Sequence, residues 1–194
     1  VGIVTQLHAQ NPALYRSFGS FRSNLMSIVR PDGGMDLYDG VLRVRDADGQ
    51  ILFDGINDQD YLQLIEEEVR PWSYMKFPHL RSLGPELGWY RVGPLARVQN
   101  CNFIPSPRAE VERQAFVAWG QGSLVHASLA YHWARMIEML HALEVISDLL
   151  DNPALLSGEL LTTGTRQRSG VGMIEAPRGT LIHDYDVGDD DLVT

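Results

Sequence analysis

The residues whose types and spacing are best suited to chemistry are Pro177, Arg178 and Gly179, near the C-terminal end of the sequence. Proline fixes the backbone angle φ and has no N–H to donate, whereas glycine leaves φ unrestricted. An arginine between them therefore lies on a constrained corner that aims its guanidinium group at one place. From spacing alone, the simplest interpretation is a turn in which Arg178 pairs with Glu175 or Asp184. The alternative is a fixed cation with a functional role.

Two strands are expected to position this corner, because apolar residues recur on both sides of it between residues 170 and 187. The longest expected element is a helix over residues 123–151, which Ser123 can cap and which Asn152 and Pro153 would end. Apolar residues cover most of its circumference, which is typical of a helix at the centre of a protein or against a partner. The sequence thus predicts a long central helix followed by a C-terminal β-hairpin.

The remaining segments predict a small antiparallel meander and shorter helices. Residues 35–56 hold apolar runs separated by Asp-Gly pairs, which are the strongest short-range signal for hairpins. Residues 1–30 are helix-prone, and further helices are expected over residues 59–69 and 108–119. Residues 71–107 are rich in proline, glycine and aromatic residues and predict irregular structure. The expected fold class is α+β, mostly helical, with the long central helix, the meander and the C-terminal hairpin.

Composition argues against several classes of protein. The 194 residues carry a formal net charge of −9, whereas a nucleic-acid groove needs clustered lysine and arginine. No uncharged run reaches the roughly 20 residues that a membrane-spanning helix needs, and we expect no signal peptide. Cys101 is the single cysteine, so an internal disulfide is impossible and a reducing compartment is expected. Its simplest role is that of a small buried hydrophobic residue.

The sequence offers no pattern of ligands for a metal. No His-x-x-x-His pair occurs, and one cysteine cannot bridge two metals. The run Asp189-Asp190-Asp191 lacks the pattern of a calcium-binding loop and is expected to be a solvated turn.

Three segments resemble one protein family. Residues 175–185 read E-A-P-R-G-T-L-I-H-D-Y, residues 90–97 read Y-R-V-G-P-L-A-R, and residues 130–138 read A-Y-H-W-A-R-M-I-E. In order and spacing they resemble the large, catalytic subunit of nickel–iron hydrogenases, and in particular its cytoplasmic, NAD-reducing (bidirectional) branch. The resemblance covers at least residues 71–185.

The resemblance implies roles for three residues at the corner. The family's matching arginine is held over the open position between nickel and iron, so Arg178 is the candidate catalytic residue. Ala176 and Pro177 would support it and line the pocket of an iron-bound cyanide. In the family, four cysteines from two Cys-x-x-Cys pairs hold the nickel–iron centre with its cyanide and CO ligands. Both pairs are missing from this sequence, so we expect neither the metals nor activity in this chain alone.

The resemblance also implies a larger assembly. Residues 1–194 would be an internal fragment of a subunit whose complete complex is a hydrogen dehydrogenase that catalyses H2 + NAD+ = H+ + NADH. The implied partners are flavin diaphorase subunits together with a small iron–sulfur subunit, and the implied location is cytoplasmic. Residues 170–194 are expected to be a truncated β segment, because a new strand begins at residue 192.

Two other hypotheses stay open. One is a fragment of the related subunit of respiratory complex I, which lines a quinone pocket without nickel and typically has lysine where this chain has Arg178. The other is a non-enzymatic subunit-contact module built on the apolar helix. The isolated chain is expected to self-associate, because an uncovered apolar helix leaves large apolar patches.

Overall fold

The computed structural model describes residues 1–158, 161 and 163–193. Strand β1 (Asn24–Val29) lies at the centre of the main sheet, and all six of its residues are buried. β1 pairs antiparallel with β2 (Val41–Arg45) and parallel with β6 (Tyr90–Arg91), and β2 pairs with β3 (Ile51–Ile56). The resulting order is β3-β2-β1-β6. A strand buried along its whole length must be covered on both faces of the sheet.

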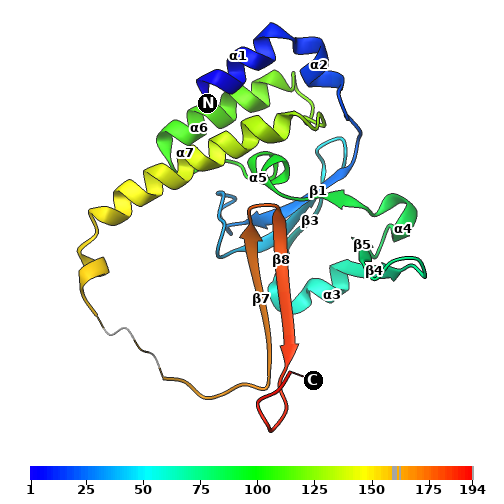
Figure 1. Ribbon diagram of the computed structural model, residues 1–194, viewed down its shortest axis with the longest axis vertical. Coiled ribbons are helices and arrows are strands. Elements are labelled where there is room, and N and C mark those ends of the chain that lie inside the picture. Colours follow the sequence, from blue (N-terminus) through cyan, green and yellow to red (C-terminus); the bar gives the residue numbers. More distant parts are fainter. Residues whose placement is uncertain (159–160, 162, 194) are drawn as a thin grey trace.

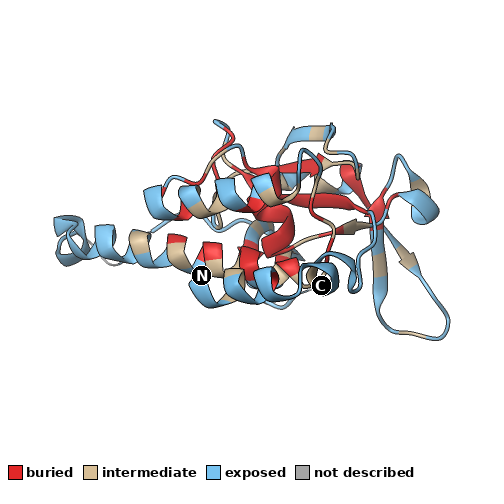
Figure 2. Cartoon of the chain, turned by 90° about the horizontal axis from the view of Figure 1, so that it is seen from above, coloured by how far each residue is buried: buried red, intermediate tan, exposed pale blue. Residues whose placement is uncertain are grey.

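Helices pack above this sheet (Figure 1). α5 (Pro94–Asn100) contacts both β1 and α7 (Ala130–Leu150), and every residue of α5 is buried. α6 (Pro107–Trp119) and α1 (Gly2–Gln10) pack on α7, and α2 (Pro12–Ser17) packs on α1. Buried residues gather where these elements meet, whereas the C-terminal half of α7 is largely exposed (Figure 2).

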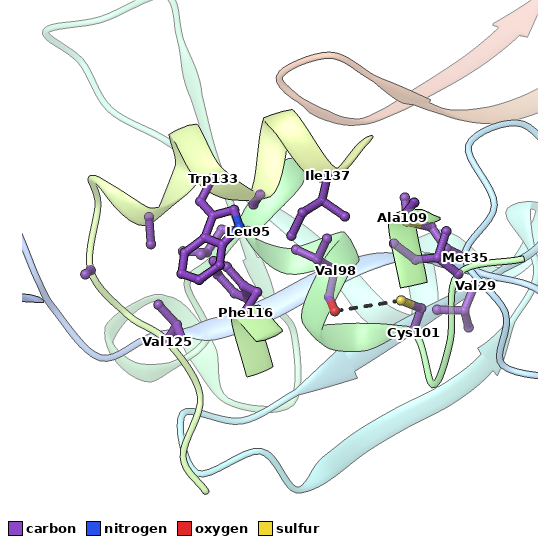
Figure 3. Packing of buried hydrophobic residues seen from close by; sticks show 14 residues of the cluster. Val29, Met35, Leu95, Val98, Cys101, Ala109, Phe116, Val125, Trp133 and Ile137 are labelled. Carbon is purple, nitrogen blue, oxygen red and sulfur yellow. Dashed lines mark hydrogen bonds between the residues drawn. The ribbon is translucent and has the colours of Figure 1, made fainter. Parts of the chain in front are cut away.

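The core between the helices is apolar and close-packed (Figure 3). Trp133 and Ile137 of α7 meet Leu95 and Val98 of α5, and Phe116 of α6 contacts Trp133 edge to face. Burying one such side chain stabilises a fold by about 1.5–3 kcal/mol. This core fixes α5 and α7 relative to β1.

Two hairpins extend the architecture. β4 (Ile65–Val69) pairs with β5 (Lys76–Leu80), and β7 (Ser169–Ala176) pairs with β8 (Gly179–Asp186) in full antiparallel register. The short helices are η1 (Asp58–Asp60), α3 (Tyr61–Leu64), α4 (Gly84–Leu87) and η2 (Pro153–Leu156). Within the described part of the chain, none of the helices combines the length and the apolar character that crossing a membrane requires.

The α+β class is confirmed, as are the hairpin around the Pro-Arg-Gly corner and the helix that ends at Trp119. The strands on either side of Asp48-Gly49 are also confirmed, because Asp46 organises this turn. Its Oδ1 accepts hydrogen bonds from the backbone N–H of Asp48 and Gln50, at 2.9 and 2.8 Å.

The long helix begins later than expected. Its first residue is Ala130, whereas residues 120–129 form a turn and an irregular segment. Gln99 holds this segment extended: its Nε2 donates to the Val125 carbonyl at 3.1 Å, and its Oε1 accepts from the Val125 N–H at 2.6 Å. These bonds replace the intrahelical bonds that residues 124–129 would otherwise form.

The expected helix over residues 59–69 is wrong. Only Tyr61–Leu64 is helical there, and Ile65–Val69 forms β4. Ile65 lies opposite Leu80 of β5 and shares its apolar cluster, while Lys76 pairs with Glu67 across the strands at 2.9 Å. Tertiary pairing thus overrides the helix propensity of the three glutamates at 66–68.

Within the meander expected over residues 35–56, residues 35–40 do not form a strand. Residues 37–38 lie in a turn, because the Asp36 carboxylate accepts from the N–H groups of Tyr38 and Asp39 at 2.8 and 3.0 Å. β1, within the segment expected to be helical, takes the place beside β2. Residues 71–107, expected to be irregular, contain β5, α4, β6 and α5.

The strand expected at residues 192–194 is reduced to one bridge between Val187 and Val193. Residue 194 lies outside the described residues.

Candidate functional site at the β7–β8 corner

The structure brings the three motif segments to one junction. The corner at residues 176–179 packs directly on Val92 and Gly93: a Cβ on Gly93 would lie 2.6 Å from the Arg178 carbonyl oxygen, and a Cβ on Gly179 would clash with Val92. Gly93 has φ +83°, a conformation that favours glycine. Tyr131 of α7 donates to the Val92 carbonyl at 2.9 Å. Segments far apart in sequence therefore share one tightly packed site.

A buried charge cluster lies beneath this corner. Arg97 of α5 donates from Nε and Nη2 to both carboxylate oxygens of Glu138 on α7, at 2.5 and 2.8 Å. Its Nη1 donates to Glu175 Oε2 at 2.7 Å and to the Ala176 carbonyl at 2.9 Å. The side chains of Arg97 and Glu175 are 2% and 0% exposed. We call Arg97, Glu138 and Glu175 the Arg97 cluster.

Glu175 also holds the hairpin against the main sheet. Its Oε1 accepts from the Ile28 N–H of β1 and from the Thr180 hydroxyl, both at 2.8 Å. Burial raises the pKa of Glu175, against the opposing effect of Arg97 and the other donors. Burial alone lowers the pKa of Arg97, but its bonds and attraction to Glu138 and Glu175 outweigh burial and raise it. Arg97 therefore stays charged.

Arg178 itself is exposed, and within the described residues its side chain has neither a hydrogen bond nor an ion pair. The simple pairing suggested by spacing does not form, because both carboxylates are engaged elsewhere. Glu175 binds Arg97, and Asp184 Oδ2 accepts from the Tyr61 hydroxyl at 2.9 Å. Pro177 is exposed and Ala176 is half-buried. The corner thus presents a guanidinium whose position is set only by its backbone.

Arg91, the other arginine of residues 90–97, has a different environment. Arg91 donates to the carbonyls of Phe21 and His126 and to the Ser23 hydroxyl, at 2.8, 2.9 and 2.7 Å. Burial lowers the pKa of Arg91. The structure gives both Arg91 and Arg97 internal partners.

Cys101 is confirmed as a buried core residue. It is 3% exposed, and its Sγ donates to the Val98 carbonyl at 3.8 Å (Figure 3). Burial raises the pKa of its thiol to about 12, so it stays protonated and is a poor metal ligand.

Across the described residues, His, Cys, Asp and Glu side chains do not gather into a group of three or more that could hold a metal ion. The donor set that nickel and iron need is therefore not supplied by these residues. We assign them no reaction step through a metal centre.

A cavity of about 460 Å³ lies beside the corner, lined among others by Tyr61, Tyr90, Val92 and Thr180. Burial raises the pKa of Tyr90 to about 12, so its hydroxyl stays protonated at neutral pH. In the described part of the chain, buried side-chain atoms without a hydrogen-bond partner do not include any lining residue. The cavity thus shows no unsatisfied group that marks a polar ligand.

Sequence reasoning missed the roles of Glu138 and Glu175. Glu138 belongs to the polar seam of a mostly apolar helix, and Glu175 precedes the Ala-Pro-Arg-Gly run. Both carboxylates lie in segments that resemble the hydrogenase family. That resemblance was the one sequence feature that pointed to them.

Comparison with known proteins shows that this chain is similar to part of several hydrogenase subunits. It matches a chain in the crystal structure of an NAD+-reducing [NiFe]-hydrogenase in the H2-reduced state with a TM-score of 0.93 and 52% identity, over 99% of this chain and 43% of that chain. The HoxS subunit beta of the NAD-reducing hydrogenase of Cupriavidus necator is 40% identical over 181 residues, 92% of this chain and 37% of that subunit.

More distant relatives are subunits of F420-non-reducing hydrogenases. One of them, from Methanothermobacter thermautotrophicus, is 35% identical over 99% of this chain and 40% of its own length. Another, an iron–sulfur subunit from Archaeoglobus profundus, is 36% identical over 88% of this chain and 36% of its own length. No protein-family model matches the chain.

These names correct one expectation. The sequence predicted a piece of the large, catalytic subunit, whereas the matched proteins include a beta subunit of the NAD-reducing enzyme, and one of the F420-non-reducing relatives is called an iron–sulfur subunit. The assignment to a large, catalytic subunit is therefore wrong. The expected relation to hydrogenases is supported, because the chain is similar, over nearly all of its length, to hydrogenase subunits. It spans less than half the length of the relatives it matches.

Proposed function

We propose that this chain is part of one subunit of an NAD-reducing hydrogenase, whose complete complex catalyses H2 + NAD+ = H+ + NADH. The observation that carries the proposal is the 52% identity and TM-score of 0.93 to a chain of an NAD+-reducing [NiFe]-hydrogenase. The relatives named above are all hydrogenase subunits, which favours this proposal over a subunit of respiratory complex I.

The NAD-linked type is favoured because the chain is more similar in sequence to its NAD-reducing relatives than to its F420-non-reducing ones. The chain is 52% and 40% identical to its NAD-reducing relatives, and 35% and 36% identical to the two F420-non-reducing relatives. The proposed partners are flavin-containing diaphorase subunits together with an iron–sulfur subunit, because electrons from H2 must reach NAD+. We propose a cytoplasmic location, where NAD+ is available.

Purification of the native complex through a tag on the subunit that contains this chain tests the proposal. The expected result is H2-dependent reduction of NAD+, followed by the absorbance of NADH. A complex that oxidises H2 with an artificial acceptor but leaves NAD+ unreduced would contradict the NAD-linked type. A complex without H2 oxidation would overturn the hydrogenase assignment.

Within this complex, we propose that Arg178 supplies a fixed positive charge at the place where H2 is handled. Splitting H2 into a proton and a hydride develops compact negative charge, which an oriented guanidinium stabilises strongly in a water-poor site. The absence of any partner for Arg178 among the described residues supports this role. Ala176 and Pro177 would hold the guanidinium in place through the backbone. The nickel and iron would bind to residues other than those described.

A further inference from the structure

We infer that the Arg97 cluster positions the guanidinium of Arg178. The inference rests on the proposed role of Arg178 and extends it to residues that lie beneath the corner. The Arg178 side chain makes neither a hydrogen bond nor an ion pair with the described residues, so its direction depends on the backbone at residues 176–179.

The contacts form a continuous path from the core to the corner. Glu138, on the rigid helix α7, orients the Arg97 guanidinium through two hydrogen bonds. The remaining edge of that guanidinium binds Glu175 and the Ala176 carbonyl. The Ala176 carbonyl lies two residues before Arg178, on the first strand of the hairpin.

The second side of the corner is fixed by close packing. Thr180 donates to Glu175 across the hairpin, and the Arg178 carbonyl lies against Gly93. Residues on both sides of Arg178 are therefore tied to the same carboxylate. A shift of Glu175 would move both strands that carry the corner.

The chemistry of the cluster favours a positioning role over a purely stabilising one. Burying one guanidinium with two carboxylates costs desolvation energy, and apolar residues of similar size often give equal or greater stability. A planar fork of donors, however, fixes the direction of its partners, which a methyl group cannot do. The cluster therefore fixes the direction of the corner, although burying its charges costs desolvation energy that apolar packing would not.

Glu175→Gln is the most informative substitution. The side chain keeps its size, but three of its contacts, Arg97, Ile28 and Thr180, donate to it. An amide NH2 must therefore face a donor, which displaces the corner. Glu138→Gln is the graded comparison, because it makes the same change on the same guanidinium but reaches the hairpin only through Arg97.

The test is a double-mutant cycle in the assembled enzyme. Glu175→Gln is expected to lower kcat for H2-dependent NAD+ reduction about tenfold, with KM for H2 within about twofold and normal assembly. Glu138→Gln is expected to cost about threefold or less. In an Arg178→Lys background, Glu175→Gln should lower kcat by less than about twofold, because the group it positions has already been replaced.

A milder pair keeps the inference testable if Glu175→Gln does not assemble. Thr180→Val removes the hydroxyl that donates to Glu175, whereas Thr180→Ser retains a hydroxyl. Val is expected to lower kcat about threefold and Ser to restore it, with the Val effect again absent in the Arg178→Lys background.

The outcomes separate the two proposals. Equal losses from Glu175→Gln, or from Thr180→Val, in both backgrounds would overturn the positioning inference while leaving the role of Arg178 intact. Wild-type turnover in Arg178→Lys alone would overturn the role of Arg178 and the inference together.

Discussion

Arg97 illustrates how a buried charge depends on its partners. Replacing it with methionine leaves Glu138 and Glu175 buried without a counter-ion, and such losses cost about 3–5 kcal/mol. We expect Arg97→Met to lower the free energy of unfolding of this chain by that amount, measured by urea denaturation. Arg22→Met is the control, because the Arg22–Asp48 pair is 64% and 71% exposed and exposed pairs contribute about 0–1 kcal/mol. Equal losses in the two variants would contradict the account of the cluster.

His126 predicts a dependence of stability on pH. A guanidinium only donates, so His126 Nδ1 accepts from Arg91 Nη2 at 2.9 Å and Nε2 donates to the Ala47 carbonyl at 3.0 Å. Burial, helped by Arg91, lowers the pKa of His126 below its ordinary value of 6.5. As pH falls through 6.5, the unfolded chain binds a proton that the folded chain does not, so stability falls.

The measurement is urea unfolding of the wild type and of His126→Asn at pH 7.5 and 5.5. Asparagine keeps an acceptor for Arg91 but does not titrate. The variant should lose less stability on acidification, by up to about 1.4 kcal/mol per pH unit. Identical acid losses in the two proteins would refute the assignment of the titration to His126.

At the scale of single residues, the sequence predicted the features that depend only on neighbouring residues. The constrained corner at Pro177, Arg178 and Gly179 follows from the conformational limits of its own residues. The partner of Glu175 was not predictable in this way, because Arg97 lies 78 positions away in the sequence. Only the fold determines that this carboxylate binds Arg97 and leaves Arg178 free.

Among the elements, the contact of the β7–β8 corner with the start of α5 gives a sharp prediction. Gly93→Ala adds a Cβ at φ +83° and 2.6 Å from the Arg178 carbonyl oxygen. Gly122→Ala is the matched control, because Gly122 has φ +86° with no heavy atom within 4 Å of the added Cβ. Gly122→Ala should cost about 1 kcal/mol, and Gly93→Ala should cost at least about 1 kcal/mol more. Thermal and urea unfolding measure both. Equal costs would show that the corner does not pack on Gly93.

Elements were predicted well where local signals agree with tertiary pairing. The Asp48-Gly49 turn joins β2 to β3, whose register shifts on either side of Val44, and the Pro-Arg-Gly corner joins β7 to β8 in continuous register. Both turns were expected. The prediction failed at β4, where Glu66, Glu67 and Glu68 favour a helix but pair with β5. It also placed the start of α7 too early, because the bonds between Gln99 and Val125 come from a different element.

At the scale of the whole molecule, helix α7 has an uncovered apolar face. Met139, Leu143, Ile146 and Leu150 follow helical spacing and are 52%, 62%, 52% and 75% exposed. Because the chain spans less than half the length of its relatives, we expect this face to be covered in the complete assembly. In the isolated chain, it should drive self-association.

Sedimentation equilibrium of residues 1–194 tests this expectation. The double variant Leu143→Lys with Ile146→Lys should weaken self-association at least about tenfold, which corresponds to about 1.4 kcal/mol. Tyr74→Lys is the control, since Tyr74 is 98% exposed and lies away from α7, in the turn between β4 and β5. A wild-type chain that stays monomeric over a wide range of concentrations would count against the prediction.

The role of Arg178 is tested most directly by the turnover of H2 in the assembled complex. Arg178→Lys should assemble normally, with unchanged metal content, and lower H2-dependent NAD+ reduction roughly 100-fold, because lysine offers a point charge in place of an oriented fork. Arg108→Lys is the control, since Arg108 is also exposed and its side chain has no partner among the described residues. It should retain wild-type turnover. Wild-type turnover in fully metallated Arg178→Lys would contradict the account.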